Sequence, residues 1–165
     1  MAKTLHILNP RIDANFKAIF TQNTEESRTA LKSFLSAAIG RKVTGVVVAE
    51  NEETKDFDSQ RGARYDINCT FDDGTLAQIE MQSYNQKQLY GKRAEYYVSR
   101  LVSSALDEGE DWDKLPKAYQ ISVLNCKFDK EHDNFFHHYA MTDISDGARL
   151  SDTLNVILLE LPKLP

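Results

Sequence analysis

Residues 65–82, YDINCTFDDGTLAQIEMQ, predict the antiparallel hairpin that decides the fold. Apolar and polar side chains alternate on both sides of the DDG sequence at 72–74, which is typical of a tight turn whose glycine supplies a positive φ. A three-residue turn sets Asp66 directly opposite Glu80, with Cβ atoms about 5 Å apart. Gln82 follows Glu80 by two positions and therefore lies on the same face of the strand.

This hairpin brings two carboxylates and an amide onto one polar face. Like charges placed opposite one another are destabilising unless a shared proton, a basic side chain or a divalent cation offsets them. Ligand sets made only of oxygen suit Mg²⁺ or Mn²⁺. A solvated outer face is the competing interpretation, because antiparallel sheets often expose one face to water. The hairpin geometry alone leaves both interpretations open.

The sequence outside the hairpin predicts helices before and after it, one further strand before it and three further strands after it. Thr24 and Gly40 are suited to start and stop the second helix. Apolar spacing predicts helices over 12–20, 24–39 and 86–106, and additional strands over 43–48, 119–125, 135–141 and 156–161. This order indicates a mixed α/β fold with an antiparallel meander at its centre.

Length and composition describe an ordinary globular chain. The 165 residues fit one domain, and the 41% hydrophobic and 27% charged fractions exclude a wholly disordered protein. No apolar run is long enough to span a membrane, and Cys69 and Cys126 lack CxxC spacing, so we expect a cytoplasmic protein without a membrane partner. The net charge of −5 opposes DNA binding unless a local basic surface or a bound metal offsets it.

The order Asp66, hairpin turn, Glu80-x-Gln82 resembles the D…ExQ form of the PD-(D/E)XK nuclease motif. More specifically, the chain resembles the PD-(D/E)XK nuclease family transposases, the recombination-promoting nuclease group. The resemblance covers nearly the whole chain, and further similarity lies in DANFKAIF at 13–20, RAEYY at 93–97 and LLELPK at 158–163.

This resemblance implies a restriction-endonuclease-like α-β-β-β-α-β core, with a central mixed sheet flanked by helices. It implies one nuclease-like domain over residues 1–165 that is C-terminally truncated relative to the family. The implied activity is metal-dependent hydrolysis of DNA phosphodiester bonds, with Mg²⁺ as the cofactor, Mn²⁺ as its substitute and DNA as the partner. A homodimer remains open.

The same resemblance assigns roles to the residues of the hairpin. Asp66 and Glu80 would be metal ligands, with the main-chain carbonyl of Met81 as the third. Gln82 stands where many relatives carry lysine. A glutamine amide can orient a water molecule but cannot carry a positive charge or act as a base, so a metal-activated water would supply the nucleophile.

Four further residues have a functional and a plainer interpretation. Asp13 could complete the catalytic site as an acidic residue of the first helix, or serve as a helix-start carboxylate paired with Lys17. Lys87, Arg93 and Arg100 lie on the helix after the hairpin and could contact DNA phosphates, or belong to a solvated helix face.

Two other functions compete with the endonuclease. One is a catalytically inactive nuclease-fold protein that acts as a DNA- or protein-binding module. The other is a metal-free acidic domain that binds proteins. A zinc site made of Cys126, His132, His137 and His138 is disfavoured, because their spacing matches no zinc template and adjacent histidines in a strand point to opposite faces.

Overall fold

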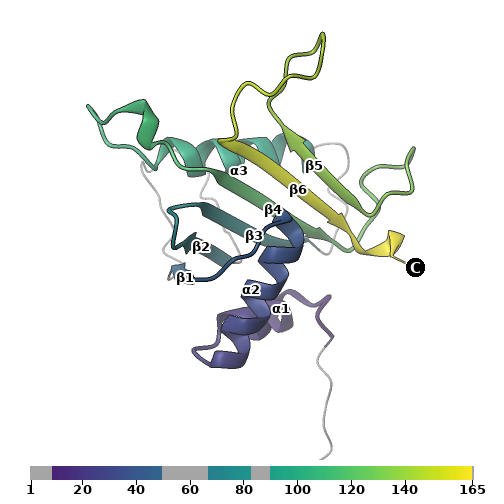
Figure 1. Ribbon diagram of the computed structural model, residues 1–165. Coiled ribbons are helices and arrows are strands. Elements are labelled where there is room, and N and C mark those ends of the chain that lie inside the picture. The colour runs from purple at the N-terminus through teal and green to yellow at the C-terminus, as the bar shows by residue number, and fades with distance from the viewer. Residues whose placement is uncertain (1–8, 50–66, 83–89, 165) are drawn as a thin grey trace, which may run out of the picture.

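The structure, a computed structural model, describes residues 9–49, 67–82 and 90–164 and shows a mixed α/β fold (Figure 1). A six-stranded sheet lies between helices on its two faces. The elements in chain order are α1 (Asp13–Thr21), α2 (Glu25–Ile39), β1 (Val46–Ala49), β2 (Ile67–Phe71), β3 (Leu76–Gln82), α3 (Tyr90–Ser103), the 3₁₀ turn η2 (Trp112–Lys114), β4 (Ala118–Leu124), β5 (Phe136–Ala140), β6 (Leu154–Glu160) and the 3₁₀ turn η3 (Leu161–Lys163).

The sheet has the strand order β1-β2-β3-β4-β6-β5. Strands β1, β2 and β3 form the predicted antiparallel meander, β4 and β6 run parallel to β3, and β5 pairs antiparallel with β6. The parallel pair β3 and β4 is joined through α3, as a crossover connection requires. The expected α-β-β-β-α-β order is present from α2 to β4.

The register of the hairpin is the one that the sequence predicts. Ile67 pairs with Ile79 and Thr70 pairs with Leu76, which is the register of a three-residue turn. The amide of Phe71 donates to the Thr75 carbonyl at 2.9 Å. Gly74 adopts a φ of +79°, which accounts for glycine at that position. The side-chain faces of β2 and β3 are therefore fixed as predicted.

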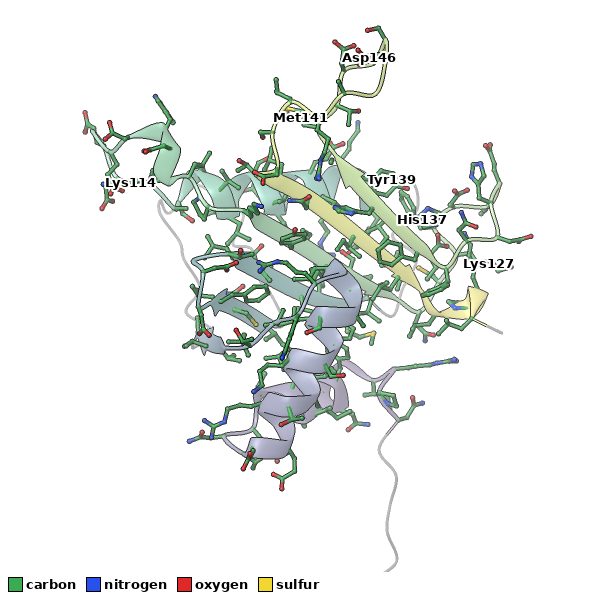
Figure 2. The ribbon with its side chains drawn as sticks, viewed as in Figure 1. Lys114, Lys127, His137, Tyr139, Met141 and Asp146 are labelled. Atoms are coloured by element: carbon green, nitrogen blue, oxygen red, sulfur yellow. The ribbon has the colours of Figure 1, made fainter. Side chains whose placement is uncertain are left out.

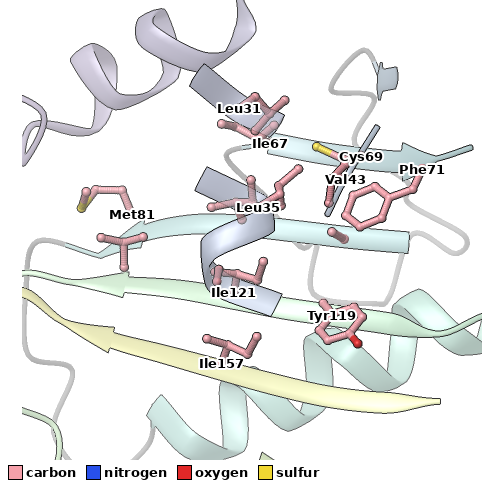
Figure 3. Packing of buried hydrophobic residues seen from close by; sticks show 14 of the residues in the cluster. Leu31, Leu35, Val43, Ile67, Cys69, Phe71, Met81, Tyr119, Ile121 and Ile157 are labelled. Atoms are coloured by element: carbon pink, nitrogen blue, oxygen red, sulfur yellow. The ribbon is translucent and has the colours of Figure 1, made fainter. Parts of the chain in front are cut away.

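Helices α1 and α2 cover one face of the sheet, in front of it in Figure 1, and enclose the main core. Leu31 and Leu35 of α2 pack against strand residues such as Ile67, Ile121 and Ile157, all without solvent exposure (Figure 3).

The ends of α2 are those predicted from sequence. The Thr24 hydroxyl accepts from the Ser27 amide at 3.2 Å, and Gly40 ends the helix with a φ of +70°. These two contacts satisfy backbone groups that a helix end leaves without intrahelical partners.

Helix α3 covers the opposite face, behind the sheet in Figure 1, where polar side chains of β3 and β4 lie beside a smaller apolar cluster that includes Tyr90, Leu124 and Leu158. Gln78, Glu80 and Gln82 of β3 point to it and are each at most 9% exposed, as are Gln120 and Ser122 of β4. The interpretation of this face as solvated is therefore wrong. The alternation of β3 resembles that of a sheet exposed on one side, but the crossover helix covers the polar side chains.

The outer part of the fold carries long connections. The segment between β5 and β6 projects beyond the sheet, with Met141 near its base and Asp146 near its tip (Figure 2). No helix among the residues that the structure describes is long and apolar enough to cross a membrane.

Candidate active site

The candidate site is built around the carboxylate of Glu80, which is 3% exposed near the C-terminal end of β3. One carboxylate oxygen accepts a hydrogen bond from the Tyr90 hydroxyl at 3.1 Å. The other forms a short ion pair with the guanidinium of Arg93. A buried charge is tolerated only where it is paired and hydrogen-bonded, and α3 supplies both partners.

Arg93 connects the residues of this site. Its Nη1 donates to the Gln82 side-chain oxygen at 3.2 Å, and its Nε donates to the Tyr97 hydroxyl at 3.0 Å. The guanidinium also lies 5.1 Å from the centre of the Tyr97 ring, within cation–π range. Tyr97 follows Arg93 by one helical turn, so it holds the guanidinium against β3.

The electrostatics of the site follow from burial and from this ion pair. Burial lowers the pKa of Arg93, but attraction to Glu80 and to Tyr97 outweighs it, so the pKa of Arg93 is raised overall. Burial, together with the negative charge of Glu80, raises the pKa of Tyr90 far above its ordinary value. Tyr90 therefore stays protonated and donates to Glu80 at neutral pH.

The main chain at the end of β3 offers a further oxygen. The Gln82 carbonyl accepts from the Asn125 amide at 2.9 Å and so points towards β4. Successive carbonyls along a strand point to opposite edges, which directs the Met81 carbonyl towards the β2 side. The Met81 side chain packs into the main core on the other face, so only its carbonyl could reach a metal at Glu80.

The oxygen donors of β3 fit a hard divalent cation only in part. Glu80 supplies a carboxylate, Met81 a carbonyl and Gln82 an amide oxygen, which is the chemistry that Mg²⁺ prefers. Within residues 9–49, 67–82 and 90–164, no three His, Cys, Asp or Glu side chains gather around a common point. The second expected carboxylate, Asp66, lies outside the described residues.

A family model for the PD-(D/E)XK nuclease family transposases matches residues 10–165 of the chain. The chain belongs to this family. A search of curated proteins gives no match, and a search of solved structures gives none.

Membership of the PD-(D/E)XK nuclease family transposases supports a nuclease fold, and the predicted site residues fall on it as follows. Glu80 and Gln82 share the buried face beneath α3, and Arg93 contacts both. Arg100 lies two helical turns beyond Arg93, towards the end of α3, and is half-buried. The solvated-face interpretation is therefore wrong for Arg93, whose side chain is 26% exposed.

Three predicted residues cannot be placed in this site. Asp66 and Lys87 lie outside the described residues. Asp13 is the first residue of α1, but its side chain is also outside what the structure describes. Their catalytic or DNA-binding roles stay predictions.

The three histidines after β4 contact three different partners. His132 pairs with Asp129 at 2.7 Å, His138 contacts the Asn155 side chain at 3.0 Å, and His137 lies 3.0 Å from Glu160. Because His137 and His138 are adjacent in β5, their side chains point to opposite faces and to different partners.

Sequence reasoning missed Tyr90 as a partner of Glu80 and Tyr97 as the residue that orients Arg93. Tyr90, Arg93, Ala94, Tyr97 and Val98 follow the spacing of one helix face, which is the signal that was available. The spacing identifies the face but not its partner, because a polar strand beneath a helix is unusual.

Proposed function

We propose that this protein is a metal-dependent DNA endonuclease that hydrolyses phosphodiester bonds at the Glu80 site. The observation that carries the proposal is the buried cluster of Glu80, Gln82 and Arg93, in a chain that belongs to a nuclease family. A carboxylate and an amide kept together under a helix cost stability, because an apolar pair would fill the same space without a desolvation penalty. Perturbed polar clusters of this kind are typical of functional sites.

The proposed metal ligands are Asp66, Glu80 and the Met81 carbonyl, with Mg²⁺ as the ion and Mn²⁺ as its substitute. The β2–β3 register supports this, because Ile67 pairs with Ile79 and the same register continued by one residue would set Asp66 opposite Glu80. Bound at these oxygens, the cation would stabilise charge on the scissile phosphate and make a water molecule more acidic.

Many members of the family carry a lysine at the position of Gln82. Here Gln82 would orient the water molecule and Arg93 would supply the positive charge. Gln82 orients the attacking water through its amide, because it has a donor and an acceptor but no charge. Arg93 supplies the positive charge, and its guanidinium already lies within 3.2 Å of the Gln82 oxygen. A planar guanidinium suits this role, since it can contact a carboxylate and a phosphate through different N–H groups.

DNA contact is proposed for the basic residues of α3 and the segment before it. Arg93, Arg100 and Lys87 would bind phosphates on either side of the scissile bond. The net charge of −5 makes such a local basic surface necessary, because the protein as a whole repels DNA. Affinity should therefore fall steeply as the salt concentration rises.

The test is nicking of supercoiled plasmid DNA by the purified protein in Mn²⁺, in Mg²⁺ and in EDTA. We expect nicking in either metal, none in EDTA, and none by Asp66→Ala. Lys127→Ala, at an exposed position in the loop after β4, is the matched control and should nick like the wild type. Nicking by Asp66→Ala at the wild-type rate would contradict the proposal.

A second function, a catalytically inactive module that binds DNA or protein, is favoured by one observation. Both carboxylate oxygens of Glu80 are engaged, one by Tyr90 and one by Arg93, and the side chain is 4% exposed. An inactive protein would keep this arrangement as a structural ion pair.

Calorimetric titration with Mn²⁺ separates the two functions. The endonuclease should bind Mn²⁺ and lose that binding in both Asp66→Asn and Glu80→Gln, whereas the inactive module should give no heat in any variant. A metal-dependent rise in Tm should accompany binding, because a ligand that binds only the folded state stabilises it.

A further inference from the structure

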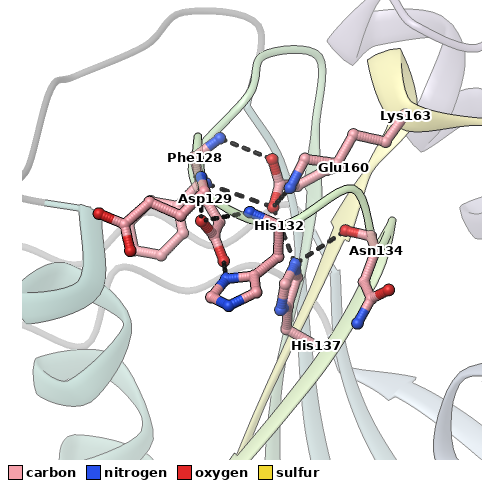
Figure 4. A network of polar contacts seen from close by, with 8 residues as sticks. Phe128, Asp129, His132, Asn134, His137, Glu160 and Lys163 are labelled. Carbon is pink, nitrogen blue, oxygen red and sulfur yellow. Dashed lines mark hydrogen bonds and ion pairs between the residues drawn. The ribbon is translucent and has the colours of Figure 1, made fainter.

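Glu160, the last residue of β6, is a carboxylate with no solvent exposure. Its two oxygens accept from the Phe128 amide at 2.7 Å, the Asp129 amide at 3.4 Å and the Lys163 ammonium at 2.9 Å, and lie 3.0 Å from His137 Nε2 (Figure 4). So many donors on one buried carboxylate show that the surrounding backbone is built around it, since an unpaired charge there would be unstable.

These contacts fix the connection between β4 and β5 at both ends. Glu160 receives the backbone N–H groups of Phe128 and Asp129 at the start of this connection. At its end, the Glu160 amide donates to the Phe135 carbonyl at 2.7 Å. His137 follows in β5 and points back to the same carboxylate. A loop held by one residue at two points has little freedom to move.

The side chain that this loop presents to α3 is Phe128. Its ring meets the ring of Tyr90 edge-on, with centres 6.4 Å apart and an interplanar angle of 71°. It also lies close to Gly91, where an added Cβ would come within 3.7 Å of the ring. Tyr90 in turn donates its hydroxyl hydrogen to Glu80. Leu124 lies between Gln82 and Glu160 in register, so both polar residues lie on the α3 face at the same end of the sheet.

We infer that Glu160 is a positioning residue for the candidate active site, acting through Phe128 and Tyr90 to hold the carboxylate of Glu80 in place. The inference rests on the proposed function for its catalytic consequence. Glu160 itself touches no reacting group. Its contribution is to keep the ring of Phe128 against Tyr90, so that the Tyr90 hydroxyl stays directed at Glu80.

The experiment compares Glu160→Gln, Phe128→Leu and the double variant with the wild type. Glutamine can accept only on one side, so it cannot serve the Phe128 amide and the Lys163 ammonium together. Leucine keeps the volume of a large apolar side chain but removes the ring contact with Tyr90. Ile157→Val is the control, because Ile157 belongs to the same strand but packs into the core on the other face.

Two measurements are made on each protein. The first is the single-turnover cleavage rate in saturating Mn²⁺, and the second is the NMR resonance of the Tyr90 ring carbon next to the hydroxyl, without metal. That resonance is assigned by its loss in Tyr90→Phe. We expect Glu160→Gln and Phe128→Leu each to shift it and to slow cleavage by about 10- to 100-fold, because a displacement of about 1 Å has effects of that size. The substrate concentration at half-maximal rate should stay within about twofold, because Glu160 is not a DNA contact.

Coupling between the two positions gives the sharpest outcome. The double variant should be no slower than the slower single variant, since both changes break the same path. Ile157→Val should lower Tm by a few degrees while its cleavage rate and Tyr90 resonance match the wild type. An unshifted Tyr90 resonance in Glu160→Gln, or multiplied losses in the double variant, would overturn the inference.

A wild type that does not cleave would overturn the proposed function instead, and the Tyr90 resonance would still decide whether Glu160 acts on Tyr90. If Glu160→Gln does not fold, Lys163→Met, which removes one donor to the same carboxylate, takes its place, and an unshifted Tyr90 resonance in that variant would overturn the inference.

Discussion

The ion pair between Glu80 and Arg93 joins two residues that lie thirteen positions apart, on a strand and on the crossover helix that follows it. Glu80 is nearly inaccessible to water, so it needs a cation from within the protein or from solution. Arg93 meets this need and also contacts Gln82, which carries no charge of its own. The charge is therefore supplied from α3 rather than from β3.

If the positive charge of Arg93 is needed beside Gln82, moving that charge to position 82 should have a predictable effect on cleavage. Arg93→Gln should slow single-turnover cleavage by roughly 100- to 1,000-fold, the size expected when one donor to the transition state is lost. Adding Gln82→Lys to Arg93→Gln should restore part of the rate, because it returns a cation to the same place. Gln82→Lys alone should be slower than the double variant, since lysine and Arg93 would then repel each other.

Cleavage assays on the three variants, with Mn²⁺ affinity measured on the same samples, provide the test. Lys92→Gln is the control, because Lys92 precedes Arg93 on α3 but is exposed. If Gln82→Lys gives no rescue in the Arg93→Gln background, the two positions do not share the charge.

Asp73, in the hairpin turn, makes the stability of the protein sensitive to acid. A hydrogen bond from Arg41, together with one from the Thr75 amide, lowers the pKa of Asp73 to about 2. A lowered pKa stabilises the folded state above the ordinary pKa near 3.9, and this contribution disappears as the pH falls towards 2. Asp73→Asn should therefore lower the free energy of unfolding at pH 7 by about 0.5 kcal/mol, a small value because the pair is exposed.

Chemical denaturation at pH 7 and at pH 2.5 measures this effect. The difference between wild type and Asp73→Asn should shrink at the lower pH. Arg41→Gln should lose more stability at pH 7 than Asp73→Asn, because Arg41 also donates to the Thr75 hydroxyl and lies over the Phe71 ring. A difference that stays constant between the two pH values would show that Asp73 does not contribute through its charge.

At the scale of elements, the hairpin was predictable and the environment of its polar face was not. Alternation and the DDG turn determine the register of β2 and β3, and those signals are local. The burial of Glu80 and Gln82 depends on α3 packing back over the sheet, which is a tertiary contact that the alternation of β3 does not encode. The role inferred for Glu160 could not be predicted from local sequence patterns either, because it depends on β6 ending beside the loop after β4.

The polar layer beneath α3 should cost stability. Gln120 of β4 has no solvent exposure, and its amide nitrogen lies 3.5 Å from the Ser122 hydroxyl, at the limit of a hydrogen bond. Its side-chain oxygen has no partner among the residues that the structure describes. A buried polar group without a full set of partners destabilises the folded state, so Gln120→Met should raise the free energy of unfolding by about 1 kcal/mol.

Thermal and denaturant unfolding of Gln120→Met measure this gain, with Thr70→Met as the control. Thr70 lies in β2, which β3 separates from β4, and is exposed, so its substitution should change stability by less than about 0.5 kcal/mol. Clear destabilisation by Gln120→Met would mean that the amide has a structural role that its contacts do not reveal.

At the scale of the whole molecule, the acidic chain and the proposed DNA substrate are reconciled only by charge placement. In the proposal, Arg93 and Arg100 of α3 supply the local basic surface that the net charge of −5 makes necessary. The face of the sheet under α1 and α2 carries the larger apolar core, and the face under α3 carries Glu80 and Gln82 beside a smaller apolar cluster. Changes in the α1–α2 core should affect folding, and changes at Glu80 and Gln82 should affect cleavage.

The central claim is that Glu80 belongs to a metal-dependent nuclease site. Single-turnover cleavage of plasmid DNA over a series of Mn²⁺ concentrations, by wild type and by Glu80→Gln, tests it most directly. Glutamine keeps the shape of Glu80 but accepts on one side only and leaves Arg93 without its anion, so Glu80→Gln should have a lower Tm without metal, and both proteins are assayed below that Tm. The wild-type rate should rise with Mn²⁺ and saturate, and the Glu80→Gln rate should be lower by roughly 1,000-fold or more, because a charged ligand is lost. Equal rates in the two proteins, or a rate independent of Mn²⁺, would contradict the account.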